Sequence, residues 1–339
     1  MATNVVQRIE KGLIEERQNL TSWLESAPPA ELEVNLASPD TQIAQEHLHV
    51  IDNALGKAAE GTLGICEVCH QAVETRLLEM DYTACVCLDH FSEQERRRLE
   101  AELEFSQAVQ KALMPQSAPV TPAFDLAVYS RPAQYVNGDY FDIFSFGDGA
   151  QGFAIADAVG HGVSAGLIMS SVQTALRILV PENDGPTAVL ERLNRVFLHN
   201  ANFPTFVTVF LGYYDPATRS LTYCNAGHPP ALVYHKQERN ILHMPPTGAA
   251  IGLLEEFNLE AQSLQLQPED ILLLYTDGLT EAINSQGEEF GVERLAELLT
   301  ENADSSATEL VRATRQELEN FLDGQPPEDD TTFIAIKFQ

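Results

Sequence analysis

Apolar residues recur at steps of three and four in the first sixty residues, which predicts two amphipathic helices. Residues 1–25 and 44–58 each carry such a stripe, and Glu16 interrupts the first one. The apolar positions are Val6, Ile9, Leu13, Leu20 and Trp23, then Ala44, Leu48, Ile51, Leu55 and Ala58. Pro28, Pro29 and Pro39 lie between the two stripes and separate the helices. We expect an antiparallel helical hairpin over residues 1–60, although two helices packing on another element would show the same pattern.

A third helix is expected from about Ser92 to Met114. Ser92 and Glu95 have the spacing of a capping box, which satisfies free amide groups at a helix start. Its apolar positions are Leu99, Leu103, Val109 and Leu113, with Ser106 interrupting, and Pro115, Pro119 and Pro122 end it. Residues 92–122 therefore read as a connecting helix and linker. Such a helix either carries a signal into the following domain, forms the seam of a homodimer or is a plain tether.

From Phe124 onward the pattern changes to short apolar runs with two helical blocks. The expected strands are 124–129, 140–146, 153–156, 206–214, 220–225, 231–234, 259–266, 271–276 and 332–337. The expected helices are 163–179, 187–199, 291–300 and 306–322. Because strands and helices cluster in separate blocks, the pattern favours an α+β fold over residues 123–339.

Composition narrows the possible partners and the compartment. The net charge of −30 would repel nucleic acid, so no nucleic-acid partner is expected. The most apolar segment, 163–180, is interrupted by Gln173, Thr174 and Arg177, and no secretory signal is visible, so neither a membrane partner nor export is expected. Five cysteines, an odd number that is mostly clustered, argue against disulfides. These features together predict a cytoplasmic protein.

Four of the soft metal ligands have the spacing of a structural zinc site. Cys66 and Cys69 form one C-x2-C pair, and Cys87 and His90 form a C-x2-H pair. Two-residue gaps let both members of a pair reach one ion from a tight turn, and zinc binding would then help to fold this segment. Cys85 is an alternative ligand or a redox-active thiol, and His70 is a weaker competitor.

Residues 47–90 resemble the DksA/TraR-type zinc finger. The resemblance rests on Ile51–Leu55, Gly61–Cys69, Arg76–Leu78, Tyr82 and Cys87. It implies a finger over residues 61–91 behind a helical hairpin, with one structural Zn²⁺. His90 stands where the family usually has a fourth cysteine, and imidazole is a competent substitute. The family's action on RNA polymerase does not carry over, because the expected hairpin tip offers no residue that would support it.

Carboxylates lie in four turns at the edges of expected strands. These turns are Asn137–Asp139, Asp157–Gly162, Tyr275–Gly278 and Glu328–Thr331. Hard oxygen ligands from several strand ends suit Mg²⁺ or Mn²⁺, and two such ions would activate a water molecule against a phosphoryl group. One Asp-Gly turn alone would be weak support, since it is common turn chemistry.

The order of these turns gives the region from Phe124 to Gln339 a specific resemblance. It resembles the PPM (phosphatase 2C) family of serine/threonine phosphatases, in its SpoIIE-like branch. The motifs are Arg131–Ala133, Asn137–Asp142, Ala156–Asp157 with Gly160–Gly162, Phe206–Thr208, Asn225–Pro230, Tyr275–Ala282 and Asp329–Thr332. The resemblance implies a β-sandwich flanked by helices, with a two-metal centre at one end. It also implies water attack on phosphoserine or phosphothreonine of an anti-sigma-factor antagonist, with regulation by the N-terminal module.

The resemblance assigns roles to individual residues. Asp139 and Asp157 would bridge the two ions, and the Ala158 carbonyl, Asp277 and Asp329 would complete the ligands; Asp330 is the alternative to Asp329. His161 is a candidate general acid or a packing residue of its turn, and Arg131 either binds the substrate phosphate or pairs with an acid. His228 reads as structural, and Asp142 and Asp330 as groups that bond metal waters. The competing hypothesis is a non-catalytic scaffold that binds transcription machinery through the hairpin and finger.

Overall fold

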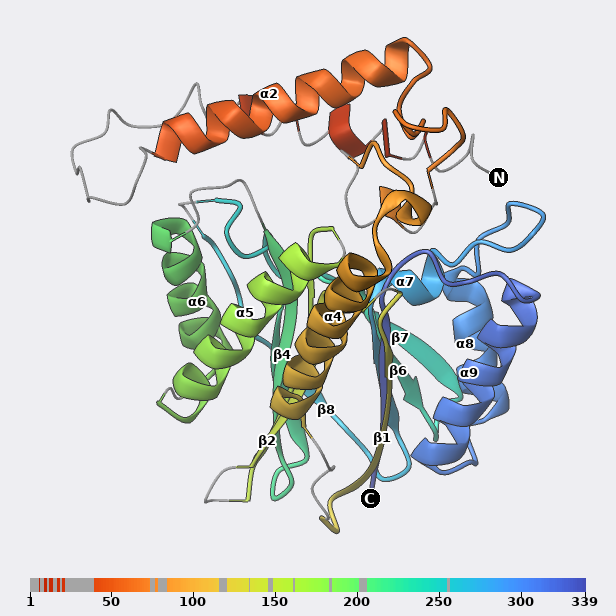
Figure 1. The fold of residues 1–339 in the computed structure, drawn as a ribbon. Coiled ribbons are helices and arrows are strands. Elements are labelled where there is room, and N and C mark those ends of the chain that lie inside the picture. The colour runs from red at the N-terminus through yellow and green to blue at the C-terminus, as the bar shows by residue number, and fades with distance from the viewer. Residues whose placement is uncertain are drawn as a thin grey trace. The chain divides into compact units, whose positions relative to one another are not determined.

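The chain divides into two compact units in the structure, which is a computed structural model. It describes residues 6, 9–10, 12–14, 17–18, 20–21, 40–73, 77–78, 84–115, 121–133, 135–145, 149–160, 162–182, 185–200, 206–254 and 257–339. One unit comprises residues 1–102 with 200–204, and the other residues 103–199 with 205–339. Figure 1 shows the elements of both units.

The N-terminal unit is built on helix α2 (Asp40–Ala59). Residues 9–10, 12–14, 17–18 and 20–21 are also helical. Leu13 and Leu20 from that segment are buried against Ile51 and Ala54 of α2 and against Leu63, which forms a small apolar core. The Arg17 guanidinium pairs with Asp52 at the edge of this core, 2.5 Å away. The two expected apolar stripes therefore pack on each other.

Helix α4 (Glu93–Leu113) runs from one unit into the other. The predicted capping box at its start is confirmed: the Ser92 N–H donates to Glu95 Oε2 at 2.9 Å, and the Glu95 N–H donates to Ser92 Oγ at 3.3 Å. Residues up to 102 belong to the N-terminal unit, and residues from 103 belong to the second unit. The connecting helix therefore contributes residues to both units.

The second unit is a sandwich of two five-stranded antiparallel sheets. One has the order β1 (Phe124–Arg131), β10 (Thr331–Phe338), β9 (Ile271–Tyr275), β6 (Ala231–His235), β7 (Asn240–Met244). The other has the order β2 (Asp139–Ser145), β3 (Gln151–Ala158), β4 (Val207–Asp215), β5 (Ser220–Ala226), β8 (Gln262–Gln265). Apolar side chains of both sheets, such as Phe153, Phe210, Ile334 and Ile336, meet between them in a fully buried core.

Helices cover the outer face of each sheet (Figure 1). Helices α5 (Val163–Glu182) and α6 (Pro186–Asn200) pack on the β2–β3–β4–β5 sheet. Helices α8 (Val292–Glu301) and α9 (Ala307–Leu322) pack on the β1–β10–β9–β6 sheet. Helix α5 is long and apolar enough to span a membrane. Its residues Met169, Val172 and Leu176 are nevertheless buried in the core on the β2–β3–β4–β5 sheet, so α5 packs as a core helix.

The structure confirms the expected α+β fold class and nearly all of the expected elements. Three elements were not predicted. One is the 3-10 helix η1 (Leu88–His90), which is too short for a helical period to show. Strand β7 is an edge strand with mostly exposed side chains, so it lacks the apolar alternation that indicates a strand. Helix α7 (Asp277–Thr280) has four residues, which is too short for a helical period to show.

Candidate functional site

Four aspartates from both sheets lie at one end of the sandwich. Asp139 opens β2 and is paired directly with Asp157, near the end of β3. Asp277 opens α7 after the end of β9, and Asp329 precedes the start of β10. Because β9 and β10 are antiparallel neighbours, the end of one lies beside the start of the other. Each sheet therefore contributes two carboxylates to the same end.

The Thr276 hydroxyl ties the two sheets together beneath these carboxylates. It donates to Asp139 Oδ2 at 2.9 Å and accepts from the Thr332 N–H at 3.0 Å. Thr276 and Thr332 are fully buried, and Asp139 is 1% exposed. A hydroxyl of the β9 side thus fixes the orientation of a carboxylate of the β2 side.

Asp330 braces the loops rather than pointing outward. Its buried carboxylate accepts from the backbone N–H groups of Ala133, at 2.7 Å, and of Gly138. Asp329, by contrast, is exposed at the rim. A Cβ at Gly278 would collide with the Asp330 carbonyl, so only glycine fits where α7 passes this loop. Both carboxylate oxygens of Asp330 are thus engaged by backbone N–H groups.

Burial and mutual repulsion make the carboxylates costly to ionise without a counter-ion. Burial, followed by the charge of Asp330, raises the pKa of Asp139 well above its usual range. Burial, followed by the charges of Asp139 and Asp277, does the same to the pKa of Asp157. For Asp329, partial desolvation and the nearby carboxylates raise the pKa to about 7. The site therefore favours bound cations.

The ligand set fits hard divalent metal ions. Asp139 Oδ1 is buried and has no hydrogen-bond partner, although Oδ2 has one. A buried charged oxygen without a partner is energetically unfavourable, so this atom is a natural ligand for an ion. Carboxylate oxygens are the ligands that Mg²⁺ and Mn²⁺ prefer. Among the described residues, one group of ligands is compact enough to surround a single ion, and it consists of Cys66, Cys69, Cys87 and His90. The aspartates are spread more widely than that group.

The other predicted site residues are placed as follows. Ala158 is buried at the end of β3, and its N–H donates to the Gly138 carbonyl at 3.1 Å. Arg131 is exposed at the end of β1, and it pairs with Thr331, two residues after Asp329. His161 falls outside the described residues.

Asp142 is not at the carboxylate cluster, because it lies on the other face of β2. It is three residues from Asp139, so its side chain points toward α5, where it accepts from Tyr140 Oη at 2.6 Å and from Arg177 Nε at 2.8 Å. The expectation that Asp142 holds a metal-bound water is therefore wrong. The expectation for His228 is confirmed: it is 1% exposed, and its Nδ1 lies 2.9 Å from Thr208 Oγ1. Burial lowers its pKa to about 3, so it stays neutral.

The contact of Thr276 with Asp139 was not predicted, although Thr276 belongs to the Tyr275–Gly278 turn. The available signal is a β-branched hydroxyl residue at a buried strand end, directly before Asp277. Such a residue has no water to bond with, so its hydroxyl must find a protein partner. Which partner it finds depends on how the two sheets pack.

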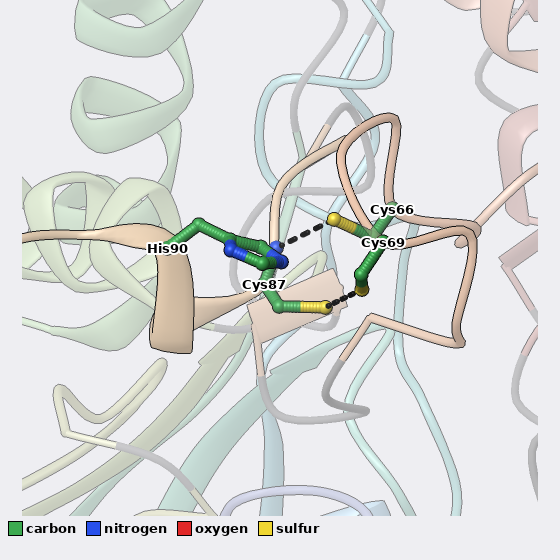
Figure 2. Close-up of side chains that lie close together, drawn as sticks. All are labelled: Cys66, Cys69, Cys87 and His90. Carbon is green, nitrogen blue, oxygen red and sulfur yellow. Dashed lines mark hydrogen bonds between the residues drawn. The ribbon is translucent and has the colours of Figure 1, made fainter.

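In the N-terminal unit, the structure brings Cys66, Cys69, Cys87 and His90 together (Figure 2). Their ligand atoms all lie within 4.8 Å of one another. The sulfurs of Cys69 and Cys87 are 3.8 Å apart, too far for a disulfide. Sulfur ligands about 2.3 Å from a tetrahedral Zn²⁺ would be about 3.8 Å apart. Cys85 is not in this group, and its carbonyl accepts from the Glu67 N–H at 2.7 Å.

The thiols of this group also differ in their tendency to ionise. Burial opposes ionisation of Cys66, but N–H donors from Cys69, Cys87 and Val68 outweigh it and lower the pKa of the thiol. Burial, followed by its contact with Cys66, raises the pKa of Cys87. One thiolate is thus prepared by the backbone, as in a metal-binding turn.

The sequence model of the family Stage II sporulation protein E (SpoIIE) matches residues 147–339. The chain belongs to the SpoIIE family. The phosphoserine phosphatase RsbU of Bacillus subtilis is 30% identical over 244 residues, which is 71% of each chain. Protein IcfG of Synechocystis is 32% identical over 263 residues, which is 69% of this chain and 41% of that protein.

Solved structures of SpoIIE-type domains show the same fold. The SiaA-PP2C domain of Pseudomonas aeruginosa superposes with a TM-score of 0.65 at 21% identity, over 72% of this chain and 99% of that one. The RsbU and RsbW domains of Rv1364c from Mycobacterium tuberculosis give a TM-score of 0.58 at 29% identity, over 67% and 63%. The second unit is thus a PPM-type protein serine phosphatase domain, and the resemblance inferred from the aspartate turns is confirmed. The DksA/TraR resemblance of the N-terminal unit has no counterpart in these matches.

Proposed function

We propose that the protein is a Mn²⁺- or Mg²⁺-dependent serine/threonine phosphatase that dephosphorylates a regulatory protein, an anti-sigma-factor antagonist, in the cytoplasm. The observation that carries this proposal is the paired arrangement of four aspartates at the end of the sandwich, with Asp139 Oδ1 buried and unpartnered. Membership of the SpoIIE family and similarity to the phosphoserine phosphatase RsbU support it.

In this proposal Asp139, Asp157, Asp277, Asp329 and the Ala158 carbonyl would hold two metal ions. The bound ions would supply an activated water and neutralise charge on the phosphoryl group. Thr276 holds Asp139 in one orientation, and Asp330 holds the Gly138 turn in place. These two residues keep the carboxylates preorganised, which limits reorganisation during the reaction.

Arg131 is the proposed contact for the substrate phosphate. Its guanidinium is exposed at the same end of the sandwich, and its planar set of N–H donors matches phosphate oxygens. His161, the predicted general acid, stays a prediction. In a protein with a net charge of −30, an exposed arginine beside the carboxylates would help a phosphate group approach.

The experiment is phosphate release from a serine-phosphorylated anti-sigma-factor antagonist, with and without added Mn²⁺. We expect activity only with metal, and a loss of at least about a thousandfold in Asp157→Asn, since a ligand that touches the reacting centre is removed. The matched control is Asp215→Asn: by register Asp215 lies at the far end of β4 from Val207, which pairs with Ala158. Metal-independent activity, or full activity of Asp157→Asn, would overturn the proposal.

We also propose that the N-terminal unit is a regulatory module with one structural Zn²⁺ on Cys66, Cys69, Cys87 and His90. The 3.8 Å sulfur separation and the compact ligand group support this. The connecting helix is the proposed homodimer seam, because Phe105, Val109 and Leu113 follow at four-residue spacing on α4 and are 71%, 45% and 44% exposed. Light scattering of wild type and Val109→Glu tests the seam, and a monomeric wild type would refute it.

A further inference from the structure

Helix α4 contributes one side chain, Gln110, to the segment that carries Asp139. We propose that Gln110 is a positioning residue of the phosphatase site: it holds the backbone of Asn137 and, through it, sets the position of Asp139 as a metal ligand. This inference rests on the proposed two-metal function. Gln110 and Asn137 both precede residue 147, where the match to the SpoIIE family model begins, so that match assigns neither residue a role.

The Gln110 amide engages both backbone groups of Asn137. Gln110 Oε1 accepts from the Asn137 N–H at 2.8 Å, and Gln110 Nε2 donates to the Asn137 carbonyl at 2.6 Å. A primary amide supplies one acceptor and a donor in fixed geometry, so the pair forms a two-point clamp. Because both bonds go to backbone, the clamp fixes where the chain lies and is independent of the side chain at position 137.

The clamp continues directly to Asp139. Asn137 is 5% exposed, and its Oδ1 accepts from the Asp139 N–H at 3.0 Å while its Nδ2 donates to Ser130 Oγ at 2.9 Å. The Gly138 N–H between them donates to Asp330. Gln110 is therefore linked to the Asp139 backbone through Asn137, first by hydrogen bonds to the Asn137 backbone and then by the Asn137 side chain, so a shift of Gln110 should move the start of β2.

Close packing on the other side leaves this segment little freedom. A Cβ on Gly166 of α5 would collide with Val136 Cγ1 and would lie 3.3 Å from Gln110 Nε2. A Cβ on Gly138 would lie 3.1 Å from the Ala165 Cβ. A second amide anchors the end of α4, since Gln173 Nε2 donates to the Leu113 carbonyl. The segment 136–138 is thus enclosed by α4, α5 and the Asp330 loop.

Gln110 is uncharged, and within the described residues its side-chain hydrogen bonds go to the Asn137 backbone, so we infer that it acts through Asn137 and not on the substrate. Its effect should appear in how well the carboxylates bind metal, and less in the rate once metal is saturating. A residue that only supported the fold would lower stability without this separation. The distinction can be measured, because metal binding and turnover are separate readouts.

The experiment compares full-length, zinc-loaded wild type with Gln110→Met, which keeps the length and helix propensity of glutamine but removes both hydrogen bonds. The matched control is Gln107→Met, an exposed glutamine on the same helix. Mn²⁺ affinity is measured by calorimetry, and hydrogen exchange of a peptide spanning 136–139 is measured without Mn²⁺. We expect roughly tenfold weaker Mn²⁺ binding and faster exchange in Gln110→Met, with phosphate release at saturating Mn²⁺ within about threefold of wild type.

A second variant approaches the same segment from the opposite side. Gly166→Ala should displace Val136 and produce the same two changes, so the inference does not depend on one substitution. Unchanged Mn²⁺ affinity and unchanged exchange in Gln110→Met would overturn it, as would equal effects in Gln107→Met. If wild type itself binds no Mn²⁺ at this site, the proposed function fails, and the exchange comparison alone then decides whether Gln110 holds the segment.

Discussion

Replacing Thr276 with valine tests whether one hydroxyl connects the two sheets at the carboxylate site. Valine keeps the branched shape of threonine on the buried end of β9, so the apolar packing is preserved. The change removes the donor to Asp139 Oδ2 and the acceptor for the Thr332 N–H. Without metal, Asp139 Oδ2 then loses this donor, and Asp139 Oδ1 already has no hydrogen-bond partner.

The size of the effect follows from these two bonds. The hydrogen bond to Asp139 contributes about 0.5–1.5 kcal/mol when this carboxyl is protonated and more when it is ionised, and a buried N–H left without a partner costs about 1–3 kcal/mol. Valine regains part of this by burying an apolar methyl group. We therefore expect the free energy of unfolding of the metal-free second unit to fall by about 3 kcal/mol. Saturating Mn²⁺ should reduce this loss, because an ion on Asp139 replaces the missing partner.

The assay is urea unfolding followed by hydrogen exchange of peptides from β9 and β10, with and without Mn²⁺. Phosphate release should require roughly tenfold more Mn²⁺ for half-maximal activity, since Asp139 loses its fixed orientation. The control is Thr222→Val, whose hydroxyl lies on an exposed strand position near Ser263, and which should change stability by less than about 0.5 kcal/mol. A Thr276→Val protein with wild-type stability and wild-type Mn²⁺ dependence would refute the cross-sheet role.

Three further predictions concern charge and metal. In the metal-free protein, the free energy of unfolding should rise as the pH falls from 8 to 5. The raised pKa values of Asp139, Asp157 and Asp329 let the folded chain bind protons, while the unfolded carboxylates, with pKa values of about 3.9, remain ionised. Urea midpoints across this pH range test the prediction, and a flat or opposite trend contradicts it. Asp157→Asn should bind no Mn²⁺ at this site in calorimetry yet be at least as stable as metal-free wild type, because repulsion from Asp139 is gone, and a clear loss of stability would count against the repulsion. Cys66→Ser should lose about one Zn²⁺ per chain by metal analysis and exchange faster across 61–73, with β3 protection unchanged; an unchanged zinc content would disprove the ligand assignment.

The sequence predicted the elements that have a strong apolar period. The strands of the two buried sheets and the helices that cover them follow from alternation and from steps of three and four. Strand β7 was missed because its side chains are mostly exposed, and α7 because it is only one turn long. The placement of Asp142 was predictable, since residues three apart on a strand face opposite ways, yet proximity in sequence to Asp139 suggested the contrary.

The Cys/His group and the aspartate turns could be predicted from the sequence, because the ligands of each turn lie within a few residues of one another. Those short spacings reflect turn geometry, which is decided locally. The connections among these groups are not local. Thr276 meets Asp139 across 137 positions, Asp330 meets Gly138 across 192, and Gln110 meets Asn137 across 27. The side chains proposed to carry the chemistry can be named from the sequence alone. The backbone and hydroxyl groups that hold them become known only from the fold, because a buried polar group takes whichever partner the packing of sheets and helices brings within reach.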